Sequence, residues 1–545
     1  MAKTWRHLLG LLMTLALLAA ACGSDDGDVD ADESEDETTE TTATGIETTV
    51  GDSEDEGEME EEETEEAAPA SGTLRMVEFS PVTTFDPAGA QSAQSAYLYP
   101  VYDTLTRQNN SFGLEPALAT AWSQPDPNTW VFELRDDVVF HDGEAFNAQV
   151  AADNLARHQA FEGNPNAATW VNMTSAEATG DYELTVSFST PQPQFPIQMS
   201  MVMGMMVSPA AFDADLARNP QGSGPWIWAE DESEAGVVEI FNLNDNYWNP
   251  ADQGVERVEV AAVPDNNARA NALLAGDADI MATARDAQIG DLLDADNVLI
   301  SVPNYFPYLV ITGRDGGIDE PLADLKVRQA IALSVDRDAY NKAIHSGLGD
   351  GLGGVYPPAF GDWHDTSLDD SFGYDPEKAK ELLTEAGYPD GITVQMPVMP
   401  AIQPHMDLVV QMLGASNINV EIIQINNGEL GPRTRQGDWG ITWFRDLLYH
   451  PANDLPKFVE GGTYDLFTPG DTADIKALLD EAASLEPAEA RPLYTEATTM
   501  LIDRGILIPL AHGGQNAVYA PSVTGVTMGL NMQAPMPYGV RVDAE

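Results

Sequence analysis

The sequence contains a single cysteine, Cys22, among 545 residues, so no disulfide can form within the chain. Basic residues are also scarce: 25 Lys and Arg stand against 89 Asp and Glu, which gives a formal net charge of −64. Nucleic acids and anionic lipid surfaces attract basic proteins, so this charge balance argues against both as partners. The apolar run at 8–18 is too short to span a bilayer.

Motifs of common catalytic chemistries are absent as well. The chain has no Gly-x-Ser-x-Gly, no His-Glu-x-x-His and no Walker-type phosphate loop. Paired carboxylates could hydrolyse glycosides, but among so many acidic residues chance pairs carry little weight. We therefore expect a binding protein without cofactor or metal. A hydrolase is the runner-up, and a structural or adhesive surface protein is a third class.

The N-terminal residues are typical of an export signal followed by a lipid-attachment site. Lys3 and Arg6 precede the apolar run, which ends in small residues. Residues 18–23 (Leu-Ala-Ala-Ala-Cys-Gly) resemble the cleavage box of bacterial lipoproteins, in which the cysteine thiol receives a diacylglyceryl group. The resemblance implies a signal peptide over 1–21, lipidation of Cys22 and anchoring to the outer face of the cell membrane. An ordinary cleaved signal is the alternative.

An acidic segment follows the cysteine. Residues 24–71 contain 22 Asp or Glu and no Lys or Arg, and they hold too few large apolar side chains to offset the entropy of ordering. We predict a disordered tether over 22–71, with a calcium-binding or partner-binding tail as the alternative. The remaining body has 67 acidic residues against 23 basic ones. This acidity could favour cationic or zwitterionic ligands, or reflect only solubility in a salty habitat.

The body is an α/β chain by its apolar periodicity. About 474 residues exceed what one hydrophobic core usually holds, so at least two domains are expected. Alternating apolar residues predict strands near 130–134 and 182–188. Helical spacing predicts helices at 325–334, 376–386, 472–485 and 487–502. Five methionines between 199 and 206 predict one face of a buried strand, with copper(I) binding as the alternative.

Several segments resemble the extracellular solute-binding proteins of peptide-type ABC importers. In chain order they are 114–122 (LEPALATAW), 139–146 (VFHDGEAF), 222–226 (GSGPW), 272–280 (ALLAGDADI), 327–337 (VRQAIALSVDR) and 374–383 (YDPEKAKELL). Much of this is scaffold: Asp142 and Gly143 predict a tight turn, and Asp375 with Pro376 predicts a helix start. The resemblance extends over 72–523.

The resemblance implies a type II periplasmic-binding-protein fold, with two lobes, a hinge and a ligand enclosed between them. Lobe I would comprise 72–305 and 506–545, and lobe II would comprise 306–505. The chain would cross between them near 303–308 and 503–509. We expect a monomer that binds a peptide or similar small solute and delivers it to the permease subunits of an ABC importer.

Residues 439–451 (WGITWFRDLLYHP) resemble the family segment whose acid meets the α-ammonium group of a peptide, and the resemblance implies that role for Asp446. A structural pair between Asp446 and Arg445, or another base, is the alternative. Trp443 and Tyr449 are candidates for an apolar ligand wall, or else for core. Arg445 is also a candidate for a bidentate bond to a ligand carboxylate.

Three further residues are weaker candidates for the ligand site, and the solute itself has several alternatives. Arg314 is a second candidate for the ligand carboxylate, and Tyr102 and Phe79 lie where the family's first lobe contributes to its cleft. A nickel chelate, an oligosaccharide, an opine or haem is the alternative cargo. His450 and His512 are the only residues that point to a metal chelate, and they show no ligand spacing.

Overall fold

The computed structural model describes residues 69–545 except 111, 427, 466–467, 469, 531–533 and 544–545. Cys22, the leader and nearly all of the acidic segment lie outside the described residues, so their roles stay predictions. No helix among the described residues has both the length and the apolar character needed to cross a bilayer.

The centre of the fold is a nine-stranded sheet of mixed direction. Its order is β15-β12-β17-β11-β1-β10-β9-β8, with β16 paired to β12 beside this path. The strands are β1 (Thr73–Glu78), β8 (Trp226–Trp228), β9 (Val238–Leu243), β10 (Arg257–Ala262), β11 (Ile280–Ala284), β12 (Val298–Ile311), β15 (Ile441–Leu447), β16 (Leu507–Pro509) and β17 (Gly513–Tyr519). Strand β1 is parallel to both β10 and β11, and the other pairs are antiparallel.

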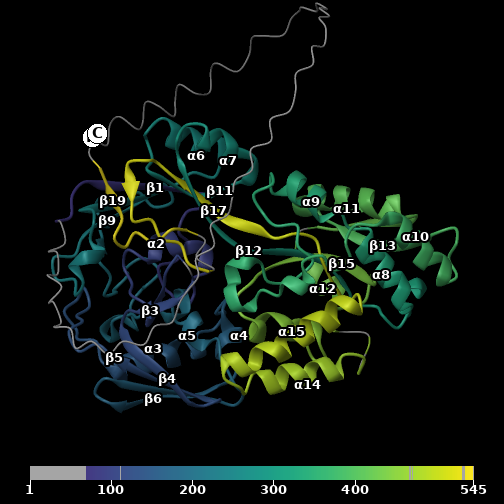
Figure 1. The fold of residues 1–545 in the computed structure, drawn as a ribbon. Helices are drawn as coiled ribbons and strands as arrows, with labels where there is room; N and C mark the ends of the chain where they lie inside the picture. Colours follow the sequence, from purple (N-terminus) through teal and green to yellow (C-terminus); the bar gives the residue numbers. More distant parts are fainter. Residues whose placement is uncertain are drawn as a thin grey trace, which may run out of the picture. The chain divides into compact units, whose positions relative to one another are not determined.

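Strand β12 changes partners along its 14 residues. Residues 298–305 pair with β17, whereas 305–311 pair with β15 and 308–310 also pair with β16. Its register against β17 shifts between Val302 and Tyr305, at the point where the partners change. Figure 1 shows this long strand running between the two groups of elements. Because β16 pairs with the later part of β12, the chain returns to the β17 side only after Pro509.

A second, four-stranded sheet is built from the first half of the chain. Its order is β4-β5-β7-β6, and the bounds are β4 (Ala119–Asp126), β5 (Thr129–Leu134), β6 (Met173–Gly180) and β7 (Glu183–Phe188). Both strands predicted from alternation are thus confirmed. Helices α3 (Ala148–Ala160), α4 (Ala167–Trp170) and α5 (Phe195–Gln198) accompany this sheet, and β2 (Thr106–Gln108) pairs with β3 (Leu114–Pro116).

The methionine cluster is buried, as predicted, but not on a strand. Met199, Met201, Met203, Met205 and Met206 are at most 6% exposed and belong to the core beneath the four-stranded sheet, except Met205, which joins the core of the large sheet. The segment follows α5 and contains the 3-10 turn η2 (Val202–Gly204). An added Cβ at Gly204 would lie 1.9 Å from the carbonyl oxygen of Met199, so the chain folds back on itself here and cannot be extended.

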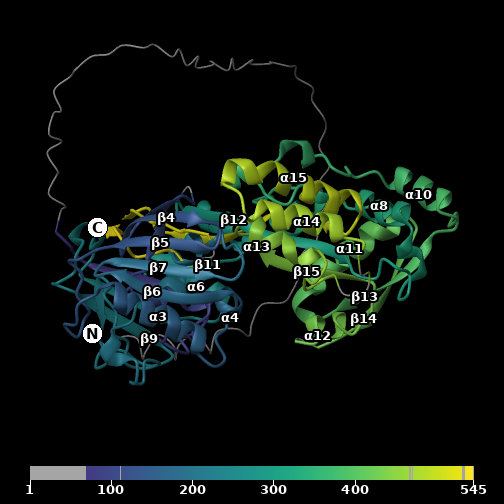
Figure 2. The same ribbon diagram turned by 90° about the horizontal axis from the view of Figure 1, so that it is seen from below.

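The second half of the chain holds most of the α-helices, and its four predicted helices are confirmed. The helices are α8 (Leu325–Leu333), α9 (Arg337–Ile344), α10 (Pro376–Glu385), α11 (Gln403–Ala415), α12 (Leu430–Thr434), α13 (Pro451–Asp454), α14 (Ala473–Ala482) and α15 (Pro487–Asp503). Strands β13 (Ile392–Val398) and β14 (Ile418–Gln424) form a parallel pair, and α11 lies beside them (Figure 2). Short elements elsewhere are α2 (Ser95–Leu98), α6 (Asn266–Leu274), α7 (Asp286–Leu293), β18 (Val523–Thr524) and β19 (Arg541–Val542).

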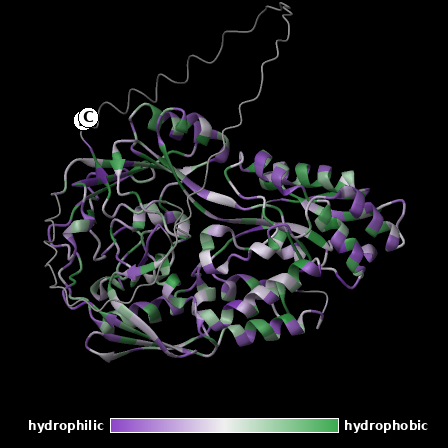
Figure 3. Ribbon diagram, viewed as in Figure 1, coloured by the Kyte–Doolittle hydropathy of each residue, from purple (hydrophilic) through white to green (hydrophobic). Residues whose placement is uncertain are grey.

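Local signals in the sequence explain where several elements begin. The side chain of Asp375 accepts a hydrogen bond from the Lys378 N–H at 2.8 Å, and Pro376 occupies the first turn of α10. Asp142 likewise accepts a bond from the Glu144 N–H, and Gly143 has a φ of 93°. Both the predicted helix start and the predicted turn are therefore confirmed. Figure 3 shows hydrophobic and hydrophilic residues interspersed along the helices and strands.

Steric contacts explain why the Gly-Ser-Gly-Pro motif needs glycine. The Gly224 N–H donates to the Val101 carbonyl at 2.8 Å, and a Cβ added at Gly224 would lie 2.5 Å from the Val101 carbonyl carbon. Backbone cannot move aside as the end of a side chain can. Only glycine therefore allows these two segments to approach so closely.

We expect Gly224→Ala to lower the free energy of unfolding by about 1–3 kcal/mol, because the added methyl group overpacks a rigid backbone contact. Gly290→Ala is the matched control, since no atom lies within 4 Å of a Cβ added there inside α7. The control should raise stability by about 0.5–1 kcal/mol. Urea unfolding followed by circular dichroism measures both. Equal effects of the two changes would contradict the steric argument.

Candidate ligand-binding site

Strand β15 carries three of the predicted ligand residues, but it divides them between two faces of the sheet. Asp446 is paired in register with Phe306, and Arg445 with Pro307. Successive side chains of a strand point to opposite faces, so Asp446 lies on one face while Trp443 and Arg445 lie on the other. The three cannot all line one pocket through their side chains.

Asp446 has two hydrogen-bond donors, and both reach the same oxygen. The Tyr308 hydroxyl and the Lys457 ammonium each donate to Oδ2 at 2.9 Å. Across the described residues, no hydrogen bond ends on Oδ1, and 22% of the side chain is exposed. The carboxylate therefore has a structural counter-ion, which is Lys457 and not Arg445, while its second oxygen remains available.

A second carboxylate interacts with the same lysine. Asp454 is 4% exposed, and its Oδ2 accepts hydrogen bonds from the backbone N–H groups of Tyr449 at 2.9 Å and His450 at 3.1 Å. Burial raises the pKa of Asp454 to about 6, although Lys457 and the hydrogen bonds act in the opposite direction. With this pKa the Asp454 carboxyl is mostly ionised at pH 7.

The pKa of Lys457 follows from the same arrangement. Burial lowers it, but the attraction of Asp446 and Asp454 outweighs burial, so the pKa lies above the usual value and the ammonium stays charged. Asp446, Asp454 and Lys457, called here the acidic trio, thus carry one net negative charge at neutral pH. One additional ammonium group would neutralise them.

Aromatic rings cover the buried side of the acidic trio. The ring of Tyr308 lies 5.3 Å from that of Phe458, and the ring of Phe444 lies 4.6 Å from that of Tyr464. Burial, followed by the negative charge of Asp446, raises the pKa of Tyr308 well above its usual value. Its hydroxyl therefore keeps its proton and remains a donor to Asp446. The rings shield one side of the ion pair from water, which strengthens the electrostatic attraction.

Arg314 and Trp443 are engaged within the protein. The guanidinium of Arg314 donates from Nε to Asp471 at 2.7 Å, from Nη1 to the Ile311 carbonyl at 2.6 Å, and from Nη2 to Asp471 and Asp465. Four of its five N–H donors are engaged and its side chain is 1% exposed, so a ligand cannot reach it, and its proposed ligand role is corrected to a structural one. Trp443 is 5% exposed and belongs to a hydrophobic core, where its Nε1 donates to the Tyr340 hydroxyl at 3.3 Å.

The other predicted residues lie in different surroundings. Arg445 is exposed, and its guanidinium carbon stacks 4.3 Å above the Tyr305 ring. Tyr102 is fully buried in the core beneath the large sheet, which corrects its assignment to the ligand site. Phe79 is half-buried directly after β1, and its N–H donates to Glu78. Of the predicted ligand residues, Asp446 and Tyr449 are thus the two that lie near each other.

Tyr449 lines a pocket of about 170 Å³ among the described residues. Its walls come from α4, α5 and Met203 on one side, and from Tyr449 and Asn453 on the other. Burial, then Asp454 and Asp446, raises the pKa of the Tyr449 hydroxyl, so the pocket lies within electrostatic reach of the acidic trio. A pocket of this size has room for one or two side chains, compared with about 300–1,000 Å³ for whole drug-sized ligands.

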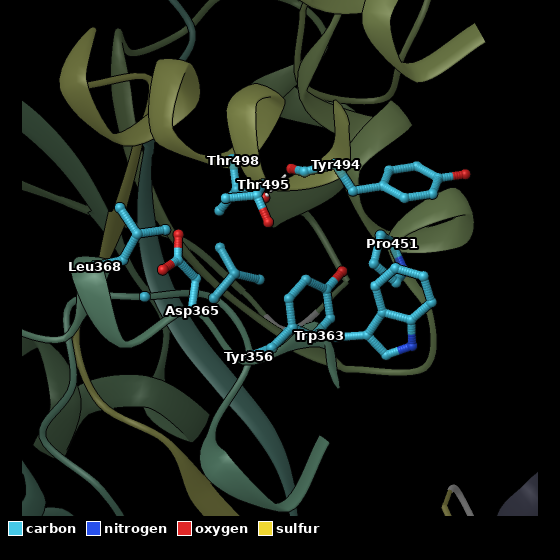
Figure 4. Close-up of a pocket in the computed structure, with 10 residues that line it drawn as sticks. Tyr356, Trp363, Asp365, Leu368, Pro451, Tyr494, Thr495 and Thr498 are labelled. Atoms are coloured by element: carbon cyan, nitrogen blue, oxygen red, sulfur yellow. Dashed lines mark hydrogen bonds between the residues drawn. The ribbon is translucent and has the colours of Figure 1, made fainter. Parts of the chain in front are cut away.

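A second cavity lies between the turn 358–363 and α15 and is much smaller. Its volume is about 10 Å³, enough for one water molecule but not for a solute. Tyr356, Trp363, Leu368 and Thr498 surround it, and the Tyr494 hydroxyl points away from its centre (Figure 4). This cavity is a packing defect and not a ligand site.

The two histidines that pointed to a metal chelate both make structural contacts. His450 accepts a hydrogen bond from the Ala452 N–H and so caps α13, and His512 is bonded to the Val355 carbonyl at 2.8 Å. Burial lowers the pKa of each imidazole to about 4, so both are neutral at pH 7. The described residues contain no cluster of three or more His, Cys, Asp or Glu that could hold a metal.

Sequence reasoning missed Lys457, Tyr308, Asp454 and the residues of α4 and α5. One signal was available, since Lys457 is the only Lys or Arg between Asp446 and Lys476 and was therefore the nearest following base. Nothing local pointed to Tyr308, which is 138 residues from Asp446 in sequence.

Comparison with known proteins identifies the family of this chain. Residues 113–482 match the family model of bacterial extracellular solute-binding proteins, family 5 (middle), which is more than half of the chain. The chain belongs to the bacterial extracellular solute-binding proteins of family 5. Its members bind solutes outside the cytoplasm and serve ABC importers, which confirms the resemblance seen in the sequence.

Curated relatives of this family 5 protein differ in the solutes that they bind. Heme-binding protein A of Haemophilus influenzae is 24% identical, over 82% of this chain and 87% of its own length. The nickel-binding periplasmic protein of Escherichia coli is 24% identical, over 78% of this chain and 86% of its own. Di/tripeptide-binding protein 1 of Pseudomonas aeruginosa is 25% identical, over 83% of this chain and 90% of its own.

Solved structures share the fold. HbpA2 of Haemophilus parasuis matches with a TM-score of 0.76 and 22% identity, over 87% of this chain and 100% of that one. DppA of Helicobacter pylori, solved with the peptide STSA, matches with a TM-score of 0.69 and 21% identity, over 87% of this chain and 99% of that one. The predicted type II periplasmic-binding-protein fold is confirmed.

Lys457→Met tests the acidic trio. The change leaves Asp446 with Tyr308 as its remaining donor, and we expect the free energy of unfolding at pH 7 to fall by about 1–2 kcal/mol, because the pair is partly screened by solvent. Lys378→Met is the control: its ion pair with Glu381 is exposed, so its loss should cost clearly less than the loss of Lys457. Chemical denaturation measures both variants. Equal losses would mean that the trio contributes no more than a surface pair.

Proposed function

We propose that this protein captures di- or oligopeptides for an ABC importer and delivers them to its permease subunits in the membrane. The observation that carries the proposal is the acidic trio, whose one net negative charge and unoccupied Asp446 Oδ1 suit the α-ammonium group of a peptide. Relatives named for di- and tripeptides support it. A peptide ammonium would bond to Oδ1 while Lys457 and Tyr308 hold Oδ2.

The proposed mechanism uses two lobes joined by β12. Lobe I would hold the residues before the change of partners near Tyr305, and lobe II the residues that follow. The second crossing would fall at 510–512, a few residues later than the sequence suggested, because β16 pairs with the lobe II part of β12. Solute binding would shift an existing open–closed equilibrium toward the closed form, which the permease recognises.

Attachment and partners are part of the same proposal. Lipidation of Cys22 would hold the protein at the outer face of the cell membrane, and the acidic segment would act as its tether. We expect a monomer with no nucleic-acid partner. The same transport role for a nickel chelate, an oligosaccharide, an opine or haem is the alternative, and a surface lipoprotein without transport function is the more distant one.

Asp446→Asn, combined with N-terminal acetylation of the peptide, tests the ammonium contact. Tri-alanine should bind the variant about 1.5–3 kcal/mol more weakly than the unchanged protein, because a charge-assisted hydrogen bond is lost. Acetylated tri-alanine should bind both proteins equally weakly, since it has no ammonium group. Isothermal titration calorimetry of the four combinations gives the coupling energy directly.

Asp438→Asn serves as the control, because Asp438 pairs with Arg433 away from the acidic trio. Its affinity for tri-alanine should match that of the unchanged protein. A coupling energy near zero in a well-folded Asp446→Asn variant would remove Asp446 from the ligand site. Absence of binding by any short peptide would overturn the peptide proposal itself.

A further inference from the structure

Arg314 cannot touch a ligand, but the groups that it holds lead to the acidic trio. It follows the end of β12, and its Nη1 donates to the Ile311 carbonyl at 2.6 Å, which attaches the guanidinium to that strand. Nη2 donates to both Asp465 and Asp471, and Nε also donates to Asp471 at 2.7 Å. The side chains of Arg314 and Asp465 are each 1% exposed. One buried guanidinium thus joins β12 to two acids that follow Lys457 in the chain.

A buried threonine supports the position of Asp465 from the other side. Thr472 is fully buried, and its hydroxyl donates to Asp465 Oδ2 at 3.1 Å. The same hydroxyl oxygen accepts a hydrogen bond from the Glu460 N–H at 2.9 Å. The two oxygens of Asp465 are therefore held by Arg314 and Thr472, and residues 460, 465 and 472 belong to one set of hydrogen bonds.

The residue before Asp465 contacts the acidic trio. The Tyr464 N–H donates to the Lys457 carbonyl at 2.8 Å, and the Tyr464 ring lies 5.5 Å from that of Phe458, the residue after Lys457. Burial, followed by the negative charge of Asp446, raises the pKa of the Tyr464 hydroxyl, so this side chain lies within electrostatic reach of the trio. The backbone of the trio's base is thus bonded to the residue next to the one that Arg314 holds.

Stability alone is a poor explanation for a buried arginine between acids. Removing the charged groups from water offsets much of their attraction, and apolar side chains of similar volume often stabilise a protein as well or better. A guanidinium adds a fixed geometry, because its planar fork accepts partners only in defined directions. Here the geometry that Arg314 fixes is that of Asp465, and through it that of the backbone beside Lys457.

We propose that Arg314 is a positioning residue for the ligand site, which keeps Lys457 paired with Oδ2 of Asp446 and so leaves Oδ1 to the solute. The inference rests on the proposed peptide-binding function and adds a residue that acts on the site without touching the solute. Its effect passes through Asp465 and Tyr464. Without the guanidinium fork, the Lys457 ammonium would no longer be held to one oxygen, and the ammonium group of a peptide would lose the oxygen left for it.

Arg314→Lys tests the proposal in the full chain, because lysine keeps the charge but lacks the fork. The readout is the ratio of the affinities for tri-alanine and acetylated tri-alanine, measured by calorimetry. The unchanged protein should prefer tri-alanine at least about tenfold, and the variant less than about threefold. The ratio compares two ligands on the same folded protein, so a loss of stability does not by itself change it.

Arg337→Lys is the matched control. Arg337 is also buried, at 6% exposed, but its guanidinium donates to the carbonyls of Pro509 and Phe372. The control should lose stability, while its preference for tri-alanine stays within about twofold of that of the unchanged protein. An equal fall of the preference in both variants would overturn the proposal, because any buried arginine would then have the same effect.

A double-mutant cycle tests the connection to Lys457 without any ligand. The loss of stability caused by Lys457→Met is measured by urea unfolding in the unchanged protein and in the Arg314→Lys variant. Independent sites give the same loss in both backgrounds. If Arg314 holds Lys457 in its pair, the loss should fall to about half in the Arg314→Lys background. The same loss in both backgrounds would overturn the proposal, whatever the protein binds.

The outcomes separate this inference from the function on which it rests. An undiminished preference for tri-alanine in the folded Arg314→Lys variant would overturn the positioning role and leave peptide binding intact. Equal binding of tri-alanine and its acetylated form by the unchanged protein would overturn the ammonium contact and, with it, the role of Arg314. If Arg314→Lys does not fold, Asp465→Asn takes its place in both experiments, since it removes the partner's charge and keeps its shape.

Discussion

The structure depends above all on the backbone pairing of β12. One uninterrupted strand is bonded to β17 over its first residues and to β15 and β16 over its last ones. The strands of the large sheet that precede β12 in the chain are thereby joined to β15, β16 and β17, which follow it, in one sheet. Its last six residues, 306–311, are buried on both faces, as expected of a central strand, and the two faces contribute to different cores. The position of Asp446 follows from this pairing, because β15 takes its register from β12.

Electrostatics then distinguish the two faces of β15. On one face Arg445 lies over an aromatic ring at the surface; on the other, Asp446 shares Lys457 with a second, more buried acid. An isolated buried carboxylate would be expensive, and a fully paired one would have nothing to offer a ligand. The acidic trio lies between these limits, with two acids to one base. Its remaining charge and its free oxygen are the features that a cationic end of a solute can use.

A buried polar group whose atoms are hydrogen-bonded within the protein is structural, whereas one with a reachable unpaired atom can recognise a ligand. Arg314 is buried and uses four of its five N–H donors on two aspartates and a carbonyl, and Asp454 is buried and accepts two backbone N–H groups of the turn at 449–450. Asp446 keeps one carboxylate oxygen that receives no hydrogen bond from the described residues, and its side chain is partly exposed. Residue type alone would have favoured the arginine as a recognition group, whereas the count of unused, reachable atoms favours Asp446.

By itself, the sequence determined the features that depend on near neighbours. Strands near 130–134 and 182–188, four helices, the cap at Asp375 and the turn at Gly143 follow from periodicity and from residues within four positions of each other. Family membership followed from short motifs, since these encode such local structure. Tertiary structure alone decided that Asp446 pairs with Lys457 and Tyr308, and that Arg314 and Tyr102 are interior. The physical reason is that a polar atom's partner and its exposure depend on the packing of distant segments, such as Tyr308 and Asp446, which are 138 residues apart, or Arg314 and Asp471, which are 157 apart, and no local pattern specifies such packing.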